Sequence, residues 1–388
     1  MHEAVIVDVV RTPGGKRNGQ LSGWHPASLA GLVLNSLVER NGLSTELVDD
    51  VIMGCVSQVG DQSLNIGRNA LLAAGWPESV PGTTIDRQCG SSQQAMHFAA
   101  QGVMSGAYDV VVAAGVESMT RVPMFSSVGD EGLPWPHEQL ARYGLTEFPK
   151  QGLGAEMIAD EYNLSRRQLD DYSAMSQERA LTATGAGRFT NEVVSVPVGD
   201  LDDVEYLTRD EGIRPGTTVE TLASLKPVFK EDGKITAGNS SQICDGASAA
   251  LIMSTTMAAE LGLRPRVRFH SFALAGTDPV SVLKGPIPVT QKILKRARLS
   301  IEDIDVIEVN EAFASVVLAW QKETGTPLEK LNPNGGAIAL GHPLGSSGTR
   351  LMATLVNELE RRGGRYGLQV MCEGGGMANA TIIERLEY

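Results

Sequence analysis

Four cysteines are the first candidates for chemistry in this chain: Cys55, Cys89, Cys244 and Cys372. None of them are spaced as a Cys-x-x-Cys pair, so the spacing excludes a zinc ribbon or a thioredoxin-type motif. Each cysteine is therefore either a small apolar core residue or a reactive thiol, and its local context has to decide between the two.

Cys89 lies between a short strand-like run, Thr83–Ile85, and an amphipathic segment that begins at Ser91. The pattern predicts a strand, a glycine-bearing turn and then a helix, which puts the thiol near a helix N-terminus. Unpaired N–H groups and the positive end of the helix dipole favour a negative charge there. We therefore expect this placement to lower the pKa of the Cys89 thiol and to make it a nucleophile, above all if a histidine assists it.

One histidine, His342, lies in an unusual segment, Asn334-Gly335-Gly336-Ala337-Ile338-Ala339-Leu340-Gly341-His342-Pro343-Leu344-Gly345-Ser346-Ser347-Gly348. Its five glycines permit unusual backbone angles and the close approach of another group, and its proline fixes the turn. This context predicts a chemical role for the histidine. The other histidines lack such surroundings and are expected at the surface or in packing roles: His2, His25, His97, His137 and His270.

Cys372 ends an apolar run and is followed by Glu373 and by three glycines, Gly374-Gly375-Gly376. These glycines would expose backbone N–H groups beside the thiol, an arrangement suited to binding the oxygen of a thioester. Because side chains alternate along a strand, we expect Glu373 to point away from Cys372 and to leave the pH dependence of the site unaffected.

Short β-branched runs alternate with longer amphipathic segments, which is typical of an α/β fold with mainly central strands. A chain of 388 residues is expected to form two or three structural units. The expected strands are Ala4–Val9, Asp50–Met53, Asp109–Ala114 and Ala249–Met253, and the expected helices are Pro26–Arg40, Ser91–Ser105 and Thr349–Arg361.

One supersecondary unit occurs twice. Asp50–Gly54 resembles Asp305–Val309, at an offset of 305 − 50 = 255 residues. Cys89 and His342 each follow a strand-like run and precede a helix, at a similar offset of 342 − 89 = 253 residues. A third pair of apolar runs follows in the same order. The three matches indicate a duplication that presents a chemical residue at an equivalent turn in each copy.

The stretch from about Thr120 to Lys234 interrupts this pattern. It is richer in charge and proline, contains a clear helix at Ser165–Thr184, and has no counterpart in the second half. We interpret it as an inserted subdomain, and insertions placed over an α/β sheet often carry substrate recognition.

The net charge of −13 argues against general nucleic-acid binding, although a local basic patch for an anionic cofactor is compatible with it. No apolar stretch approaches the roughly 18 residues that cross a bilayer, and the N-terminal residues do not form a secretory signal. We therefore expect a cytoplasmic protein without disulfides that binds neither nucleic acid nor membrane.

Six motifs occur in the order and over the length that the thiolase family shows. They are Arg11-Thr12-Pro13, the segment around Cys89, Thr236-Ala237-Gly238-Asn239-Ser240-Ser241, Asn310-Glu311-Ala312-Phe313-Ala314, Gly341-His342-Pro343 and Cys372-Glu373-Gly374-Gly375-Gly376. This resemblance implies a duplicated, five-layered α-β-α-β-α fold with an inserted loop domain that holds coenzyme A, in agreement with the repeat and the insertion. The implied units are an N-terminal half at 1–119, continued by about 240–264, the loop domain at 120–239, and a C-terminal half at 265–388.

The resemblance also implies a role for each chemical residue. Cys89 attacks the 3-keto carbon of a 3-ketoacyl-CoA while His342 takes its proton, and Cys372 protonates the departing acetyl-CoA enolate and then deprotonates a fresh CoA thiol. His342 and a water held by Asn310 stabilise the enolate oxygen, and the N–H groups of Cys89 and Gly374 stabilise the tetrahedral oxyanion. Neither a metal nor a tightly bound cofactor is implied, since CoA is a substrate.

For CoA, the resemblance places Arg214 near the nucleotide end, while Thr221 and Ser241 face the adenine and pantetheine portions. The alternative for Arg214 is a solvated surface charge. Members of the family are dimers or tetramers, so a homodimer or homotetramer is implied.

Some positions depart from the family pattern. Asp86 and Ser92 stand where the family usually has Asn and Gly, and Lys150-Gln151-Gly152 stands where short-chain biosynthetic enzymes carry His-Met-Gly. The last departure, with Gly238-Asn239-Ser240-Ser241-Gln242, favours degradative thiolysis of 3-ketoacyl-CoA in fatty-acid or sterol side-chain β-oxidation. Lys16-Arg17-Asn18-Gly19 also resembles thiolases that act on bulky or steroid side chains.

Three alternatives stay open. The first is an acetoacetyl-CoA thiolase (acetyl-CoA acetyltransferase) that works in the biosynthetic direction. The second is a condensing ketoacyl synthase, although such enzymes usually carry a His-Gly-Thr where this chain has Asn310-Glu311-Ala312. The third is an inactive lipid-binding relative, against which the intact Cys89, His342 and Cys372 argue.

Overall fold

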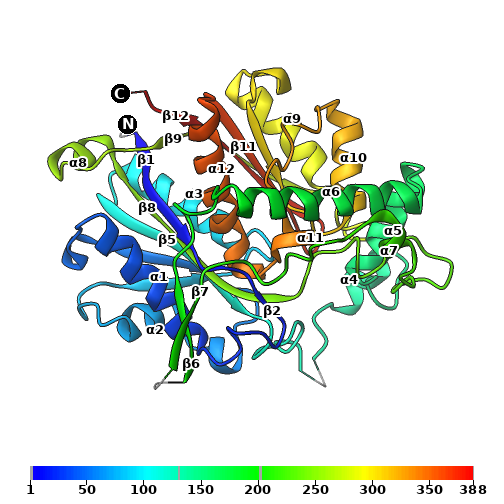
Figure 1. The fold of residues 1–388 in the computed structure, drawn as a ribbon, viewed down its shortest axis with the longest axis horizontal. Helices are drawn as coiled ribbons and strands as arrows, with labels where there is room; N and C mark the ends of the chain where they lie inside the picture. The colour runs from blue at the N-terminus through cyan, green and yellow to red at the C-terminus, as the bar shows by residue number, and fades with distance from the viewer. Residues whose placement is uncertain (1–2, 130–131, 201–202, 388) are drawn as a thin grey trace.

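The computed structural model describes residues 3–129, 132–200 and 203–387 (Figure 1). The strands of its main sheet are β1 Ala4–Arg11, β2 Gly15–Lys16, β3 Asp50–Gly54, β4 Gly82–Ile85, β5 Val110–Ser118, β8 Cys244–Ser254, β9 Val267–Gly276, β10 Val306–Val309, β11 Tyr366–Glu373 and β12 Met377–Arg385. Across the sheet they follow the order β10-β11-β12-β9-β1-β8-β5-β3-β4, and β2 pairs with β8.

The helices include every one predicted from the sequence. Their bounds are α1 Pro26–Arg40, α2 Ile66–Ala73, α3 Ser91–Ser105, α4 His137–Arg142, α5 Gln151–Glu161, α6 Arg166–Gly185, α7 Val219–Ala223, α8 Thr255–Glu260, α9 Pro286–Ala297, α10 Ala314–Thr324, α11 Ala337–Leu340 and α12 Ser347–Arg362. The predicted strands are also confirmed, and β5 and β8 are longer than expected because polar residues at their ends continue the ladder between them.

The main sheet consists of two similar halves. In the N-terminal half, β3 runs parallel to β5, β5 pairs antiparallel with β8, and β8 pairs antiparallel with β1. In the C-terminal half, β10 runs parallel to β11, β11 pairs antiparallel with β12, and β12 pairs antiparallel with β9. The two halves join where β1 pairs with β9 at Val5↔Arg268 and Ile6↔Val267. The predicted duplication is confirmed.

Two aspartates mark equivalent positions in the two halves. Asp49 accepts hydrogen bonds of 2.6 and 2.9 Å from two successive backbone N–H groups at the start of β5. Asp305 does the same at the start of β11, with bonds of 2.7 and 3.0 Å. The offset between the copies is therefore 305 − 49 = 256 residues, and the predicted match of Asp50 with Asp305 is wrong by one residue. Asp49 and Asp50 are adjacent, so the sequence alone does not show which of them binds the backbone of the neighbouring strand. The hydrogen bonds show that it is Asp49.

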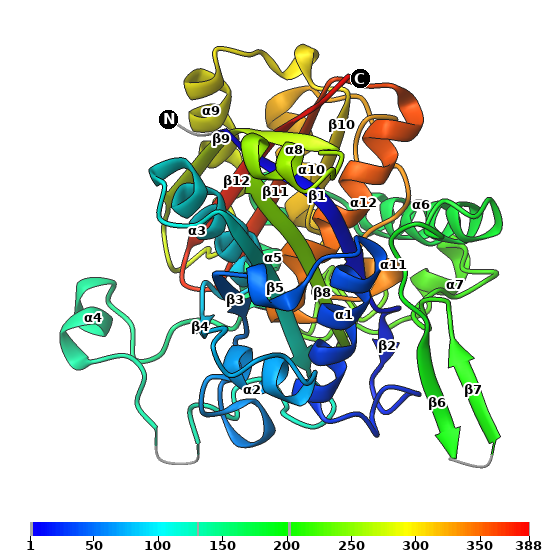
Figure 2. The same cartoon turned by 90° about the vertical axis from the view of Figure 1, so that its left-hand side faces the viewer.

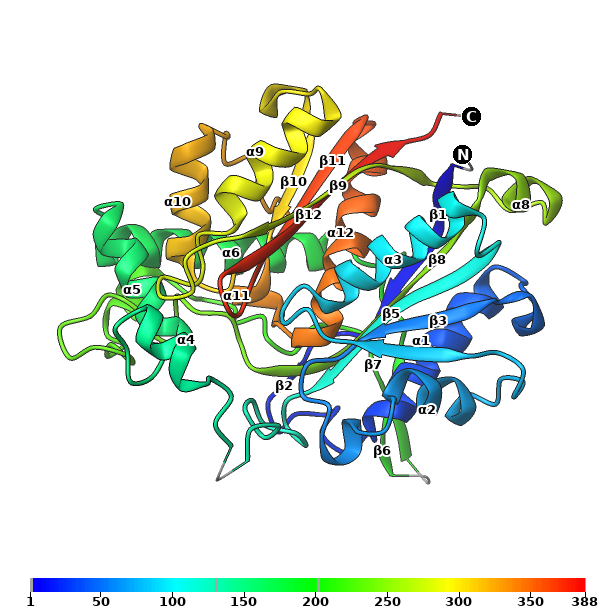
Figure 3. The ribbon, with the colours of Figure 1, turned by 180° about the vertical axis from the view of Figure 1, so that it is seen from behind.

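Three apolar clusters alternate with the two half-sheets. The first packs α1 and α2 on one face of the N-terminal half and includes Leu34 and Val112. The second, which includes Met96 and Leu355, lies between the halves and contains α3 and α12. The third packs α9 and α10 on the far face of the C-terminal half and includes Trp320. This gives the predicted order of helix, sheet, helix, sheet and helix, and Figure 3 shows α3 and α12 as its central layer.

The chain between β5 and β8 leaves this layered core. It contains α4 to α7 and a hairpin of β6 (Val196–Asp200) and β7 (Asp203–Leu207), and in Figure 2 the hairpin and α4 extend away from the core. The longest helix of this segment, α6, starts at a capping box formed by Ser165 and Gln168, which confirms the helix predicted there. Among the described residues, no helix is both long and apolar enough to span a membrane.

Candidate active site

Cys89 lies on a tight turn between β4 and α3, as predicted. Gln88, the residue before it, has a φ of 49°, a left-handed conformation that is uncommon for a side chain of this type. Asp86 stabilises that conformation by accepting a 2.6 Å hydrogen bond from the backbone N–H of Gln88. Ser91, at the start of α3, accepts a 2.9 Å bond from the N–H of Arg87 and donates a 2.6 Å bond to the carbonyl of Gln88. The turn is thus fixed from both sides of the thiol.

The thiol of Cys89 is uncharged at rest. Burial raises its pKa well above the usual value, and the neighbouring Cys372 and Glu373 raise it further. The N–H groups of Cys89 and Gly374 oppose this rise by hydrogen bonding to the sulfur, with smaller effect. The prediction that the helix N-terminus gives Cys89 a lowered pKa is therefore wrong in its net direction, because desolvation outweighs the local dipoles. Cys89 needs a base to become a nucleophile.

His342 lies between α11 and α12 in the glycine-rich segment, and its hydrogen bonds define its tautomer. Its Nδ1 is 2.5 Å from the hydroxyl oxygen of Ser347, and that hydroxyl donates its own proton to the carbonyl of Pro343 at 2.8 Å. Because the serine proton is already engaged, Nδ1 carries the imidazole proton and donates it to Ser347. Nε2 is then unprotonated and accepts a 3.3 Å hydrogen bond from the amide nitrogen of Asn310, which a proton from a thiol would replace.

The imidazole of His342 is also neutral. Burial lowers its pKa to about 3, and the buried guanidinium of Arg350 contributes to this shift. A neutral imidazole with a bare Nε2 can act as a base at any pH at which the protein would normally work.

Cys372, at the end of β11, is linked to His342 through Asn310. Burial raises the pKa of the Cys372 thiol to about 12, while a hydrogen bond from the side chain of Asn310 opposes this rise. The amide nitrogen of Asn310 lies 3.3 Å from Nε2 of His342. The predicted catalytic residues from the two halves of the fold therefore meet in one buried cluster, in which the thiols and the imidazole are all uncharged.

Gly374 lies where the sequence analysis placed an oxyanion site. Its N–H and that of Cys89 both approach the sulfur of Cys89, so both would face the oxygen of an acyl group carried there. A Cβ at Gly374 would lie 2.9 Å from the side-chain oxygen of Gln88 and 3.2 Å from the amide nitrogen of Gln151. The two glutamine side chains thus border the site on one side.

Comparisons with known proteins agree with this arrangement. Residues 4–256 match the family model "Thiolase, N-terminal domain", and residues 263–385 match "Thiolase, C-terminal domain". The chain belongs to the thiolase family. This thiolase is 49% identical over 397 residues to the steroid 3-ketoacyl-CoA thiolase FadA6 of Mycobacterium tuberculosis, covering 100% of this chain and 95% of that protein. It is 44% identical over 393 residues to a 3-ketoacyl-CoA thiolase of Klebsiella pneumoniae, with both chains covered in full.

A solved structure also superimposes on this thiolase. The crystal structure of the acetyl-CoA acetyltransferase of Bacillus anthracis matches with a TM-score of 0.92 at 38% sequence identity, and the match covers 100% of this chain and 99% of the other. The α/β thiolase fold with its two related halves is therefore common to both proteins.

Several buried residues that support the site were missed in the sequence. Glu117, at the end of β5, accepts hydrogen bonds of 2.9 to 3.0 Å from the backbone at Val56 and Ser57 and one of 2.9 Å from the N–H of Gly345, so it anchors the loop after His342. Ser347, which sets the tautomer of His342, lies in the same glycine-rich segment, where nothing in the sequence distinguishes it from the neighbouring Ser346. For Glu117, the available signal was a charged residue that directly follows the apolar run 110–116 of the same strand.

Glu311, in the Asn-Glu-Ala-Phe motif, is a further residue whose role the sequence did not reveal. It accepts hydrogen bonds from Tyr172 (2.8 Å) and Ser176 (2.7 Å) on α6, and from the N–H of Ile338 (3.1 Å) on α11. Glu311 thereby ties the inserted segment to the segment that leads into His342 and fixes the backbone next to Asn310.

The side chain of Glu373 differs from expectation. As alternation along the strand predicts, it lies on the face of β11 opposite to that of Cys372. There it packs against Gly90 in the turn that carries Cys89. In its ionised form it nevertheless contributes to raising the pKa of both Cys89 and Cys372. The prediction that Glu373 has no electrostatic influence on the site is wrong, because a buried charge acts over several ångströms whatever its direction along the strand.

The residues predicted to contact CoA lie on adjacent segments of the insertion and of the loop before β8. Gln242, next to Ser241, donates a 2.8 Å hydrogen bond to the carbonyl of Gly212, and Gly238 packs against Leu222 beside Thr221. The hydroxyl of Thr221 is engaged in capping α7, since it donates a 2.8 Å bond to the carbonyl of Thr218. Contact with a ligand would therefore use its remaining acceptor capacity.

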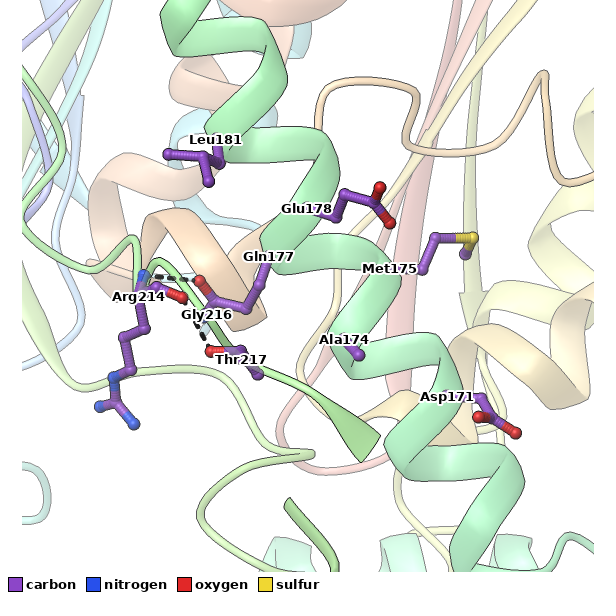
Figure 4. A pocket seen from close by; sticks show the side chains of 9 residues that line it. All are labelled: Asp171, Ala174, Met175, Gln177, Glu178, Leu181, Arg214, Gly216 and Thr217. Atoms are coloured by element: carbon purple, nitrogen blue, oxygen red, sulfur yellow. Dashed lines mark hydrogen bonds between the residues drawn. The ribbon is translucent and has the colours of Figure 1, made fainter. Parts of the chain in front are cut away.

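Arg214 lines a pocket of about 290 Å³ beside α6. Its backbone N–H donates a 2.8 Å hydrogen bond to Gln177, and its exposed guanidinium extends to one side of α6, whereas Glu178 and Asp171 lie toward the other side (Figure 4). Within the part of the chain that the structure describes, no acidic side chain forms an ion pair with Arg214, and no cluster of side chains is suited to holding a metal ion.

Proposed function

We propose that this thiolase uses CoA to cleave 3-ketoacyl-CoA into acetyl-CoA and a shortened acyl-CoA. The enzyme is a 3-ketoacyl-CoA thiolase, an acetyl-CoA C-acyltransferase that acts in β-oxidation. The observation that supports our assignment of roles is the cluster of two neutral thiols and a neutral imidazole whose Nε2 is unprotonated. A reaction that must move a proton twice and bind two oxyanions needs such a set of groups.

In the first half-reaction, the thiol proton of Cys89 passes to Nε2 of His342 as the sulfur bonds to the 3-keto carbon. The N–H groups of Cys89 and Gly374 bind the resulting oxyanion. The bond between C2 and C3 then breaks, its electron pair moves to C2, and Cys372 donates its proton there to release acetyl-CoA. His342 and a water held by Asn310 bind the enolate oxygen in this step.

In the second half-reaction, the thiolate of Cys372 takes the proton of an incoming CoA thiol. The CoA sulfur attacks the acyl carbon on Cys89, the acyl–sulfur bond breaks, and Cys89 recovers its proton from His342. Cys372 thus ends the cycle as a thiol. Each thiol is stable in its neutral form, which favours the return of both protons.

The preferred substrate is a 3-ketoacyl-CoA longer than four carbons. Two observations support this preference. Lys150-Gln151-Gly152 stands where short-chain biosynthetic enzymes carry His-Met-Gly. Relatives that match over the full chain include a steroid 3-ketoacyl-CoA thiolase and a β-ketoadipyl-CoA thiolase of Escherichia coli. The alternative is an acetoacetyl-CoA thiolase that works in the biosynthetic direction, which the match to an acetyl-CoA acetyltransferase favours.

Three further statements belong to the same proposal. Arg214, Thr221 and Ser241 bind CoA, with Arg214 at its anionic nucleotide end, and CoA enters as a substrate. The chain divides into halves at 1–119 with 240–264 and at 265–388, and a loop domain at 120–239 recognises CoA. The enzyme is a cytoplasmic homodimer or homotetramer, which light scattering coupled to gel filtration would test directly.

A series of 3-ketoacyl-CoA substrates of increasing chain length tests the substrate assignment. We expect kcat/KM for thiolysis to rise beyond acetoacetyl-CoA. A kcat/KM that is highest for acetoacetyl-CoA and falls steadily with length would refute the degradative assignment and support the biosynthetic one. Omission of CoA separates the half-reactions, because the acyl group should then remain on the enzyme.

A further inference from the structure

Glu373 is a carboxyl group that the proposed mechanism does not use, although it lies beside the nucleophile. Its side chain is fully buried, and neither of its oxygens has a hydrogen-bond partner among the described residues. A buried carboxylate without a partner is costly, so the group needs either a proton or a counterion.

Gly90 shows what surrounds this carboxyl. A methyl group at Gly90 would collide with Oε1 of Glu373 and would lie 2.7 Å from Nδ2 and 2.9 Å from Oδ1 of Asn379, so the carboxyl and the amide face the same side of the turn. The amide nitrogen of Asn379 donates a 3.0 Å hydrogen bond to the carbonyl of Gly90, which fixes the orientation of that amide. Its Oδ1 has no hydrogen-bond partner among the described residues either.

Two hydrogen-bond acceptors on one face cannot satisfy each other, whereas a protonated carboxyl is a donor. We propose that Glu373 acts in its protonated form as a positioning residue: it donates to Oδ1 of Asn379, and Asn379 in turn holds the Gly90 carbonyl and thereby the turn that carries Cys89. This inference rests on the roles proposed above for Cys89 and Cys372, and it adds a proton-dependent support to them.

The charged groups around Glu373 agree with a neutral carboxyl. Burial raises the pKa of Glu373 to about 8, Asp86 raises it too, and Arg87 opposes the shift. Arg87 contacts Met377 on β12, and His97 on α3 is uncharged because burial lowers its pKa to about 3. Arg87 is therefore the positive group that faces Glu373, and Asp86 is the negative one.

The direction of the pH effect follows from these groups. Below a pH of about 8 the carboxyl keeps its proton and supports the turn. Above it, the carboxylate loses its bond to Asn379 and adds a negative charge that makes both thiols harder to ionise. Since burial lowers the pKa of His342 to about 3 and raises that of Cys372 to about 12, neither of these two groups changes charge near pH 8, where Glu373 does. It should set the alkaline limit of the enzyme.

The test is the rate at which a 3-ketoacyl-CoA acylates Cys89 in a single turnover without added CoA, followed by intact-mass spectrometry across a pH series. Omission of CoA removes the titration of its thiol from the profile. In the wild-type protein we expect the rate to fall about tenfold one pH unit above the midpoint. Glu373→Gln cannot ionise but retains a donor for Asn379, so its rate should stay within about twofold over the same range.

Two further variants separate positioning from a general effect on folding. Glu373→Leu removes the donor and should slow acylation about tenfold at neutral pH, the loss expected for one buried hydrogen bond to a neutral group. Glu308→Gln is the matched control, because Glu308 is also a buried strand carboxyl with an unpartnered oxygen, on β10. Its alkaline profile should follow that of the wild type.

An alkaline fall of equal size and midpoint in wild type and Glu373→Gln would overturn the inference, as would a wild-type rate that does not fall. If Glu373→Gln does not fold, infrared difference spectra of the wild-type protein and of Glu308→Gln decide: in both, one protonated carboxyl should lose its carbonyl stretch around pH 8. Failure of the catalytic role proposed for Cys89 would be distinguishable from failure of this inference, because no acyl adduct would then form on Cys89 at any pH.

Discussion

Replacement of Ser347 by alanine tests how the fold prepares His342 for catalysis. Ser347 accepts the Nδ1 proton of His342 at 2.5 Å, because its own hydroxyl proton is engaged by the carbonyl of Pro343. Without this acceptor, the tautomer with a bare Nε2 contains a buried and unpaired N–H group. The imidazole can then move its proton to Nε2, where it can no longer accept a proton from Cys89.

The magnitude follows from the penalty for an unpaired buried donor, roughly 1–3 kcal/mol. If this penalty falls on the active tautomer, kcat should decrease roughly 5- to 150-fold, since about 1.4 kcal/mol corresponds to tenfold. KM for the 3-ketoacyl-CoA should change little, because Ser347 is buried and contacts His342 at Nδ1, the ring nitrogen that does not take the proton of Cys89. Steady-state thiolysis, followed by loss of the enolate absorbance of the substrate, gives both quantities.

Ser173→Ala is a matched control. Like Ser347, Ser173 is a buried helical serine that donates to the carbonyl four residues before it, here Leu169 at 2.7 Å. In thermal unfolding Ser173→Ala should lose about 1 kcal/mol of stability for its one hydrogen bond, and Ser347→Ala should lose more, because it removes two. Only Ser347→Ala should lose kcat. A kcat of Ser347→Ala within twofold of the wild-type and Ser173→Ala values would refute the tautomer argument.

Three other predictions follow from the site and the fold. Cys89→Ala should abolish the acyl adduct seen by intact-mass spectrometry, whereas Cys372→Ser should still form it but turn over about 10² to 10⁴ times more slowly; an adduct that survives in the first variant and vanishes in the second would reverse the assignment. Arg214→Ala should raise KM for CoA more than KM for dephospho-CoA, and equal changes would argue for a solvated surface charge. Asp49→Asn and Asp305→Asn should each destabilise the fold by about 1–3 kcal/mol in urea unfolding, because each removes a charged acceptor from two backbone N–H groups; a large effect at only one of them would contradict their equivalence.

The sequence was sufficient to predict the fold class and the duplication, and it singled out Cys89, His342 and Cys372, whose catalytic roles stay a prediction. Cys89, His342 and Cys372 each lie where a strand or turn meets glycines, and that local pattern is visible without a structure. The support residues Ser347 and Glu117 were not predictable in the same way. They are ordinary polar residues whose role comes from burial and from partners far along the chain.

The sign of the Cys89 pKa shift could not be predicted from the sequence for a related reason. The helix N-terminus that favours a thiolate is local, whereas the desolvation that opposes it depends on every layer packed around the turn. Glu373 shows the same limit. Its direction along β11 followed from alternation, but its contact with Gly90 depends on how the two halves of the fold meet.

The offset of 256 residues between the two copies implies that they have specialised. The counterpart of Cys89 is residue 89 + 256 = 345, Gly345, where a side chain would collide with the backbone of Cys55, with Cβ only 2.7 Å from its Cα. The counterpart of His342 is residue 342 − 256 = 86, Asp86, which shapes the nucleophile turn. Neither copy therefore holds both the nucleophile and the base, and the second copy has no room for a thiol at that turn. Each polypeptide has one reaction centre despite its internal symmetry, so an oligomer should bind one acyl group per chain.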